Sequence, residues 1–422
     1  MSVLLGSYSP AFFKMKVDVD GDIDLNSMSP SDFSVFIHEY IHFIQDFTTA
    51  SGCRRIYVYG EFIRQCVKQV TEGPRSFHVP IAIPQYENNV LPNLDLLDRV
   101  EGDEEEETVV VIDKIETIDE EIVDKDGRKI RFKSVVVWTI GDTPISFGAH
   151  SIKESMAYLV EQLCSTSFSK SPDYPYNMVR LISDFVLGKN HLDDYSLLAL
   201  CDVSLLTSNP GLTLFEFLHL IKKGRVNVVN PEDIYDFFYL QKSIQYDTGE
   251  IVMAISDYLL SASLAWSTLK QYYSLERLND LNEWMDKVFV IGMNLRLNEK
   301  YFMLKMARDG KDKSNRILQY FAKAIGSPLM ENKQGQMYKL RLSTGEPPTE
   351  YLYVLEQFFD LFKKGSLQCD MKSWCDKNSG TPLAPADARC VNAPWSRCQD
   401  GNLCPYALFW RHRGLTGFTP VR

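Results

Sequence analysis

The segment that follows Ser29 repeats its apolar residues with the period of an α-helix. The repeat runs through Phe33, Phe36, Ile37, Ile41 and Ile44. Ser29 offers an N-cap hydroxyl, Pro30 suits the first helical position, and Gly52 is a residue at which the segment can end. We therefore predict one helix from about residue 30 to residue 52 and a second over residues 56–70.

The chain before and after these helices shows other patterns. Residues 12–19 form a strand-like run that ends at the turn signal Asp20-Gly21-Asp22. From Gly148 to about Lys364 the helical period dominates. From Ser366 onward that period is lost, and proline, glycine, tryptophan and cysteine become frequent. This last pattern predicts a small irregular module.

Residues 76–148 have the texture of an inserted β unit. Runs rich in β-branched residues at 109–112 and 135–140 lie on either side of an Asp126-Gly127 hairpin signal. The acidic run at residues 98–107 is predicted to be a solvated loop rather than a site for a basic partner.

Together these patterns predict an α+β fold whose 422 residues suffice for a proper buried core. We expect four segments: N-terminal strands and a first helical pair in 1–75, the inserted β unit in 76–148, a mostly helical region in 149–365 and a cysteine-rich module in 366–422.

Charge and hydropathy narrow the class of protein. The chain has 45 basic and 56 acidic residues and a formal net charge of -11, so nucleic acid is not an expected partner. Residues 1–16 lack a secretory signal, and the apolar stretch 251–269 is interrupted by Asp257, which predicts a buried helix rather than a membrane span. Nine cysteines without an export signal predict reduced thiols and a cytoplasmic location.

The first predicted helix carries the segment His38-Glu39-Tyr40-Ile41-His42. Positions i and i+4 lie one turn apart on the same helix face, so both histidines can present a ring nitrogen to one zinc ion. Glu39 can then take a proton from an activated water and return it to a leaving amine. The alternative is a helix with one solvent-facing and one core histidine; the apolar neighbours, which can bury a site, favour zinc.

This segment resembles the signature of the zincin metallopeptidases. The resemblance implies a zincin-like catalytic core, a Zn²⁺ cofactor and hydrolysis of a peptide bond by water. The metzincin extension would need glycine at position 45 and histidine at position 48, where this chain has Gln45 and Thr48. The gluzincin branch, in which a glutamate on a later helix is the third ligand, is the better match.

For the third ligand the resemblance favours Glu154, near the start of the next strong helical segment. Ser151-x-x-Glu154 is also a capping-box pattern, in which the glutamate would only satisfy a backbone donor. Glu161, seven residues further along the same face, is the next candidate. His150 and His191 follow.

The sequence assigns no residue to two other roles in the expected site. Gluzincins usually have an acid four residues after this glutamate to orient a zinc-bound histidine, but Tyr158 occupies that position here. A donor to the tetrahedral oxyanion is also required, and Tyr158, His150 and His191 are alternatives between which the sequence does not choose.

Five cysteines crowd into the C-terminal module, at Cys369, Cys375, Cys390, Cys398 and Cys404. Their spacing matches neither the Cys-x2-Cys pairs of common zinc modules nor the usual ferredoxin spacings. Structural metal, a disulfide and buried thiols are the alternatives.

The leading hypothesis is a cytoplasmic zinc endopeptidase of narrow specificity with Glu39 as general base and His38, His42 and Glu154 as ligands. It would act on a protein or peptide, and a regulatory protein is considered as a second partner. Neither nucleic acid nor a membrane is expected. The alternatives are a noncatalytic interaction protein with a structural zinc or no metal, and a hydrolase that cleaves an amide in a small molecule.

Overall fold

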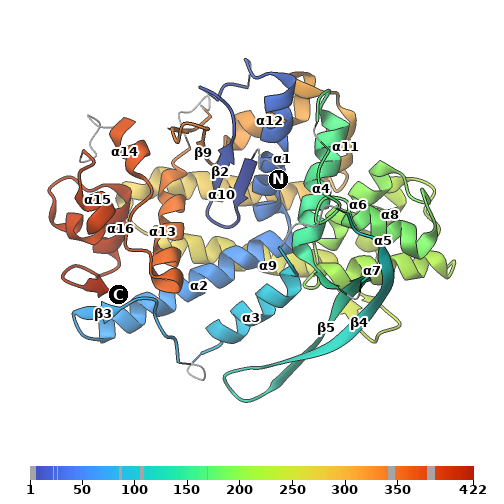
Figure 1. The fold of residues 1–422 in the computed structure, drawn as a ribbon, viewed down its shortest axis with the longest axis horizontal. Helices are drawn as coiled ribbons and strands as arrows, with labels where there is room; N and C mark the ends of the chain where they lie inside the picture. The colour runs from blue at the N-terminus through green and yellow to red at the C-terminus, as the bar shows by residue number, and fades with distance from the viewer. Residues whose placement is uncertain are drawn as a thin grey trace.

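The computed structural model describes residues 6–21, 23–25, 27–84, 88–104, 109–141, 143–168, 170–340, 347–377 and 385–422. Helices form most of the molecule, and short strands form small sheets at its edges and between the helices (Figure 1). The mixture of both element types confirms the α+β class that the sequence predicts.

The helices are α1 (Pro30–Thr48), α2 (Ala50–Glu72), α3 (Val90–Glu101), α4 (Ala149–Cys164), α5 (Met178–Leu187), α6 (Asp194–Ser204), α7 (Pro210–Lys222), α8 (Pro231–Leu240), α9 (Ala254–Tyr272), α10 (Asn279–Asn298), α11 (Phe302–Arg308), α12 (Arg316–Ile325), α13 (Glu350–Lys364), α14 (Lys372–Lys377), α15 (Arg389–Asn392) and α16 (Pro405–His412). Short 3-10 helices are η1 (Glu276–Leu278), η2 (Asp312–Ser314) and η3 (Pro394–Gln399). The strands are β1 (Gly6–Ser9), β2 (Lys14–Val17), β3 (Ser76–His78), β4 (Ile112–Val123), β5 (Lys129–Thr139), β6 (Pro144–Phe147), β7 (Ile244–Gln245), β8 (Ile251–Val252), β9 (Leu329–Glu331), β10 (Met337–Tyr338) and β11 (Thr419–Val421).

Helix α1 begins where the sequence predicts but ends earlier. The Ser29 side chain accepts a hydrogen bond from the backbone N–H of Asp32, as expected of an N-cap. The break falls at Thr49, whose extended backbone ends α1 and whose hydroxyl caps α2 by accepting from the N–H of Gly52 at 3.0 Å. Gly52 is needed for close packing instead, because a Cβ atom there would lie 2.5 Å from the Gln45 carbonyl oxygen.

The N-terminal strands join a sheet with residues from much later in the chain. The order is β1-β2-β9-β10, and β2 pairs with β9 in parallel, with Lys14 opposite Leu329. Ala11 and Phe13 adopt positive φ in the turn between β1 and β2, so the strand expected over residues 12–19 is confined to β2. Asp22 of the predicted turn lies outside the described residues.

The inserted segment contains a helix that the sequence reading missed. Helix α3 takes up part of the acidic run, whose residues 98–101 form its last turn instead of a solvated loop. Glu101 is buried there, with its carboxylate 2.7 Å from both Arg55 Nη2 and Lys153 Nζ. Two basic partners explain why an acid in a charged run can enter the interior. Residues 105–107 of the run lie outside the described part of the chain.

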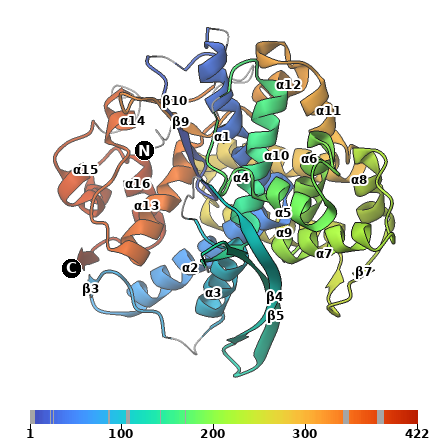
Figure 2. The ribbon, with the colours of Figure 1, turned by 45° about the vertical axis from the view of Figure 1, so that its right-hand side comes forward.

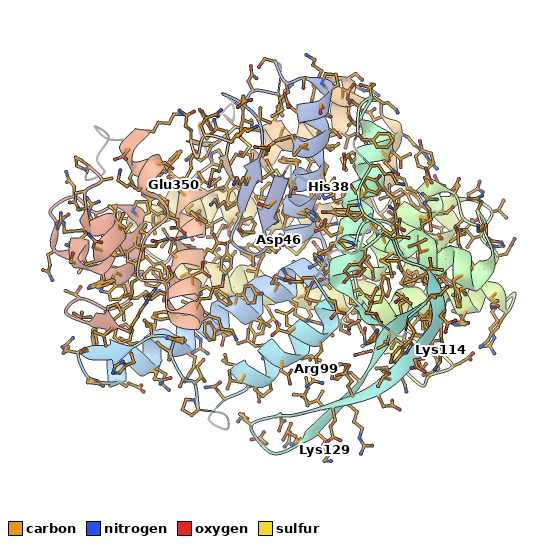
Figure 3. All side chains as sticks on the ribbon, viewed as in Figure 1. His38, Asp46, Arg99, Lys114, Lys129 and Glu350 are labelled. Carbon is orange, nitrogen blue, oxygen red and sulfur yellow. The ribbon has the colours of Figure 1, made fainter. Side chains whose placement is uncertain are left out.

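A long antiparallel hairpin of β4 and β5 extends from the body of the molecule, and β6 pairs with β5 on its other edge (Figures 1 and 2). The Asp126-Gly127 signal lies at its tip, as predicted. Strand β4 begins at Ile112 instead of residue 109 and continues through an acidic stretch. Figure 3 shows Lys114 and Lys129 on this hairpin. Because much of the hairpin is exposed, charged side chains can occupy its strands.

Residues 254–269 of the apolar stretch form most of α9, which packs against α2 and α10, so the predicted helix is confirmed. Only one face of α9 is buried, since Leu260 is 62% exposed. In the described part of the chain, no helix has the length and apolar character needed to cross a membrane. Strand β11 pairs in parallel with β3, which ties the C-terminal module to residues 76–78. The boundaries of the four segments expected from the sequence stay a prediction.

A fully buried ion pair holds the end of α1 against α6 and α10. The Arg296 guanidinium lies 2.7 and 2.8 Å from the two carboxylate oxygens of Asp202, and neither side chain has any exposed surface. Arg296 Nε also donates to the Thr48 carbonyl oxygen at 2.6 Å. That carbonyl belongs to the last turn of α1, where no intrahelical donor remains.

We expect Asp202→Asn to lower the free energy of unfolding by about 3–5 kcal/mol, because it leaves the Arg296 charge buried without its counter-charge. Chemical denaturation would measure the change. Lys305→Ala, which breaks the exposed pair of Lys305 and Glu299, is the control and should stay within about 0.5 kcal/mol of the parent. Equal stability of the two variants would contradict the anchoring role of Asp202.

Candidate metal centre

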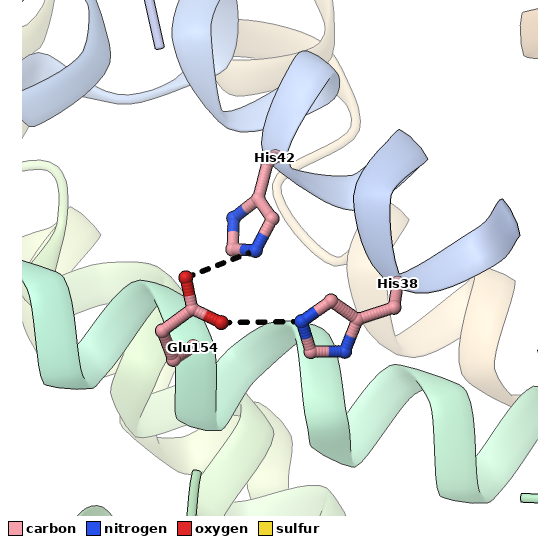
Figure 4. A group of neighbouring side chains, drawn as sticks. All are labelled: His38, His42 and Glu154. Atoms are coloured by element: carbon pink, nitrogen blue, oxygen red, sulfur yellow. Dashed lines mark hydrogen bonds and ion pairs between the residues drawn. The ribbon is translucent and has the colours of Figure 1, made fainter. Parts of the chain in front are cut away.

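Helices α1 and α4 pack side by side and bring the three predicted ligands together (Figure 4). His38 Nε2 lies 3.1 Å from Glu154 Oε2, and His42 Nε2 lies 3.3 Å from Glu154 Oε1. One ligand atom from each residue lies within 4.8 Å of the others. Two imidazoles and a carboxylate are a donor set suited to zinc, so these residues fit the ion that the sequence predicts.

Glu154 lies in the second turn of α4, because the helix begins earlier than a capping box requires. The N-cap is Gly148, so Ser151 already lies inside the helix, and no side-chain cap is formed. The capping interpretation is therefore wrong. Gly148 permits close packing here, because a Cβ atom would lie 2.3 Å from the Val100 carbonyl oxygen at the end of α3.

The other residues weighed as ligands lie elsewhere or act differently. His150 lies one turn before Glu154, and His191 is exposed between α5 and α6; neither belongs to the three-residue group. Glu161 Oε2 lies 3.1 Å from His38 Nδ1, on the side of the ring opposite Glu154. Glu161 is thus placed to orient a ligand, a role in which the sequence reading did not consider it.

Each histidine has a polar partner for its second ring nitrogen. Glu161 contacts His38 and accepts a hydrogen bond from the Ser34 hydroxyl at 2.6 Å. His42 Nδ1 lies 2.9 Å from Gln45 Oε1, while Gln45 Nε2 donates to the Lys153 carbonyl oxygen at 3.2 Å. Such outer contacts set the tautomer and the orientation of metal-ligating imidazoles.

The position that gluzincins give to an acid is occupied by a buried tyrosine with other contacts. The Tyr158 hydroxyl accepts a hydrogen bond from the Ser171 backbone at 3.4 Å. Glu161, almost one turn further along α4, supplies the carboxylate instead. The departure from the gluzincin pattern at residue 158 is therefore matched by a nearby substitute on the same helix.

Glu39 is buried beside the cluster and beneath strand β1. A Cβ atom at Gly6 of β1 would lie 2.5 Å from Glu39 Oε1. The absence of a side chain at Gly6 therefore makes room for the Glu39 carboxylate. Burial, partly offset by the charges of His38 and His42, raises the pKa of Glu39 from 4.5 to about 7. A carboxylate with a pKa near neutrality can both accept and return a proton.

Without a metal, the three central side chains form a charged network. Burial lowers the pKa of His38, but hydrogen bonds with Glu154 and Glu161 outweigh burial and raise that pKa well above its ordinary value. Burial raises the pKa of Glu154, yet His42 and His38 hold it well below its ordinary value. A metal ion that bound here would therefore displace protons from the histidines.

Two tyrosine rings lie against the histidines, and neither tyrosine is identified from the sequence. The Tyr8 ring from β1 stacks on His42 with a centroid distance of 6.2 Å, and its hydroxyl donates to Asp46 at 2.8 Å. Figure 3 shows Asp46 further along α1 from His38. The partly exposed Tyr176, from the turn before α5, has its ring centroid 5.7 Å from that of His38. No periodic signal links either tyrosine to the motif.

The cluster is largely buried, yet the side chains of His38, His42 and Glu154 keep 10%, 9% and 17% of their surface exposed. Solvent therefore reaches the three residues. Comparisons of the chain with known protein families, with curated proteins and with solved structures found no match. The resemblance to zincins accordingly depends on the motif and on the local geometry of the site.

We expect Glu161→Gln to weaken zinc binding by about 10–100-fold, because the variant removes the carboxylate that orients His38. A competition titration with a chromophoric zinc chelator would measure the affinity. Glu216→Gln on α7 is the matched control, since it makes the same change at a buried glutamate outside the cluster. An unchanged affinity in Glu161→Gln would contradict the orienting role.

Proposed function

We propose that this protein is a zinc-dependent peptidase of narrow specificity, with His38, His42 and Glu154 as ligands and Glu39 as the general base. The observation that carries the proposal is the approach of Glu154 to both histidines of the motif, from a helix more than a hundred residues later in the chain. Glu39 beside this cluster supplies the remaining group that hydrolysis requires.

When bound, zinc would supply Lewis acidity, which polarises a carbonyl group and makes water nucleophilic near neutral pH. His38 and His42 would hold the ion through their Nε2 atoms, which both face Glu154. Glu39 would accept the proton of the attacking water and pass it to the leaving amine, for which a pKa near 7 is well suited.

The number of ligands in the cluster favours catalysis over a structural metal. Structural zinc sites are usually closed by four protein ligands, whereas catalytic sites keep one position for water or substrate. Within the described part of the chain, the group contains three residues. Their partial exposure would let a substrate approach.

Tyr176 is the candidate donor to the oxyanion. Tyr176 is partly exposed, and its ring centroid lies 5.7 Å from that of His38. A preorganised donor at that point would stabilise the charge that develops on the carbonyl oxygen.

Glu39→Gln should keep about one zinc ion per chain yet reduce peptide cleavage by about 100-fold or more, because it removes the proton acceptor and no ligand. Metal analysis of the purified protein and a quenched fluorescent peptide library would measure the two effects. His38→Ala should lose both zinc and cleavage.

The matched controls are Glu216→Gln and His219→Ala, both on α7 and outside the cluster, and each should keep zinc and activity. A parent protein without bound zinc would rule out the proposed peptidase. Full cleavage by Glu39→Gln would rule out Glu39 as the base. Free digestion of unfolded casein would contradict narrow specificity.

For Tyr176→Phe we expect a fall in kcat of about 10–100-fold, with zinc content and the pH profile of the Glu39 ionisation retained. Steady-state kinetics on the best library peptide would separate kcat from KM. Tyr57→Phe on α2 is the control, since Tyr57 is likewise a partly buried tyrosine on another element. A change in KM alone would assign Tyr176 to substrate binding instead.

A further inference from the structure

Four of the five cysteines in the C-terminal module converge on one small cavity. They come from the loop after α13, from α14, from α15 and from the N-cap of α16, and are Cys369, Cys375, Cys390 and Cys404. We call them the four converging cysteines. They are buried and are free thiols. The sequence separates them by irregular intervals, so only the tertiary structure brings them together.

The four converging cysteines lie together as one group and do not form two separate pairs. Each of the six possible pairs among the four converging cysteines is close enough for electrostatic interaction between their sulfur atoms. The cavity between them also has just enough room for a water-sized sphere. Four sulfurs around a common space have the arrangement of a metal-ligand set.

Burial raises the pKa of Cys375 and Cys404, and two neighbouring groups partly offset that shift. Arg397 has only 2% of its surface exposed, and its Nη1 donates to Cys390 Sγ at 2.9 Å. Cys404 lies at the N-terminus of α16, where the backbone N–H of Ala407 points at its sulfur from 3.5 Å. Buried cations and helix N-termini both stabilise thiolates, the form in which cysteine binds metals.

Cys398 provides an internal contrast. It is also buried, and it lies on η3 within the same module. It does not line the cavity, and its sulfur lies 3.9 Å from the Nε2 atom of Gln399. Proximity along the chain therefore does not explain why the other four meet.

The spacing of the sulfurs distinguishes between two kinds of metal centre. Sulfurs bound to one zinc ion at about 2.3 Å lie about 3.8 Å apart in a tetrahedron. Among the described residues, the one group of three or more His, Cys, Asp or Glu side chains placed to hold a metal ion is that of His38, His42 and Glu154, which contains no cysteine. A cluster of several iron and sulfide ions holds its cysteines further apart than a single ion does.

We propose that the four converging cysteines bind an iron–sulfur cluster. Such a centre would join four segments of a module that has little regular structure of its own. Figure 1 places this module, drawn in red, at one end of the molecule, away from α1 and α4. The proposal is independent of the peptidase function, because the two sites share no residue.

The test uses the full chain, purified without oxygen and then reconstituted with ferrous iron and sulfide. The parent should contain equal amounts of iron and inorganic sulfide, about two or four of each per chain, and absorb visible light. Serine variants at each of the four converging cysteines should lower iron and sulfide by about fivefold or more. Cys398→Ser, the matched control, should keep both.

Further measurements distinguish lost binding from lost folding. Electron paramagnetic resonance of the reduced parent should show the signal of a cluster. This measurement needs no substitution, so it does not depend on whether a variant folds. His38→Ala should keep iron and lose zinc, which separates this centre from the candidate peptidase site. A reconstituted parent without iron, zinc bound by the four converging cysteines, or equal iron loss in Cys398→Ser would each overturn the assignment.

Discussion

The burial of α1 on nearly all sides is the constraint on which the structure depends. From Phe36 to Thr48 its residues are buried, although several of them are polar or charged. A buried polar group without a partner costs about 1–3 kcal/mol, so each of these side chains requires a neighbour at a fixed place. The helices and strands around α1 supply those partners.

Three neighbours of α1 each supply one such partner. Helix α4 contributes Glu154 to the histidines, the β1–β2 turn donates a backbone N–H to Asp46, and α10 contributes Arg296 to the helix end. The candidate metal site is therefore part of the interior polar network. A ligand set held in this way loses little conformational entropy when a metal binds, which favours precise coordination.

The two candidate metal sites divide the available chemistry between them. The cluster on α1 and α4 offers imidazole and carboxylate donors and is reached by solvent. The C-terminal module offers only thiols, which prefer softer metal centres such as iron–sulfur clusters. Donor type would thus separate the two proposed metal centres. The cysteines of the module are buried, and Arg397 packs against Cys390.

The sequence by itself determined the local features: the capped start of α1, the hairpin turn at Gly127, the helix at residues 254–272 and the spacing of His38 and His42. These depend on periodicity and on nearby residues. Only the tertiary structure decided that Glu154 meets the histidines while Glu161 orients one, and that four cysteines share a cavity. Those contacts join residues far apart in the chain, where packing and close approaches such as that at Gly148 set the geometry. Neither periodicity nor composition contains that information.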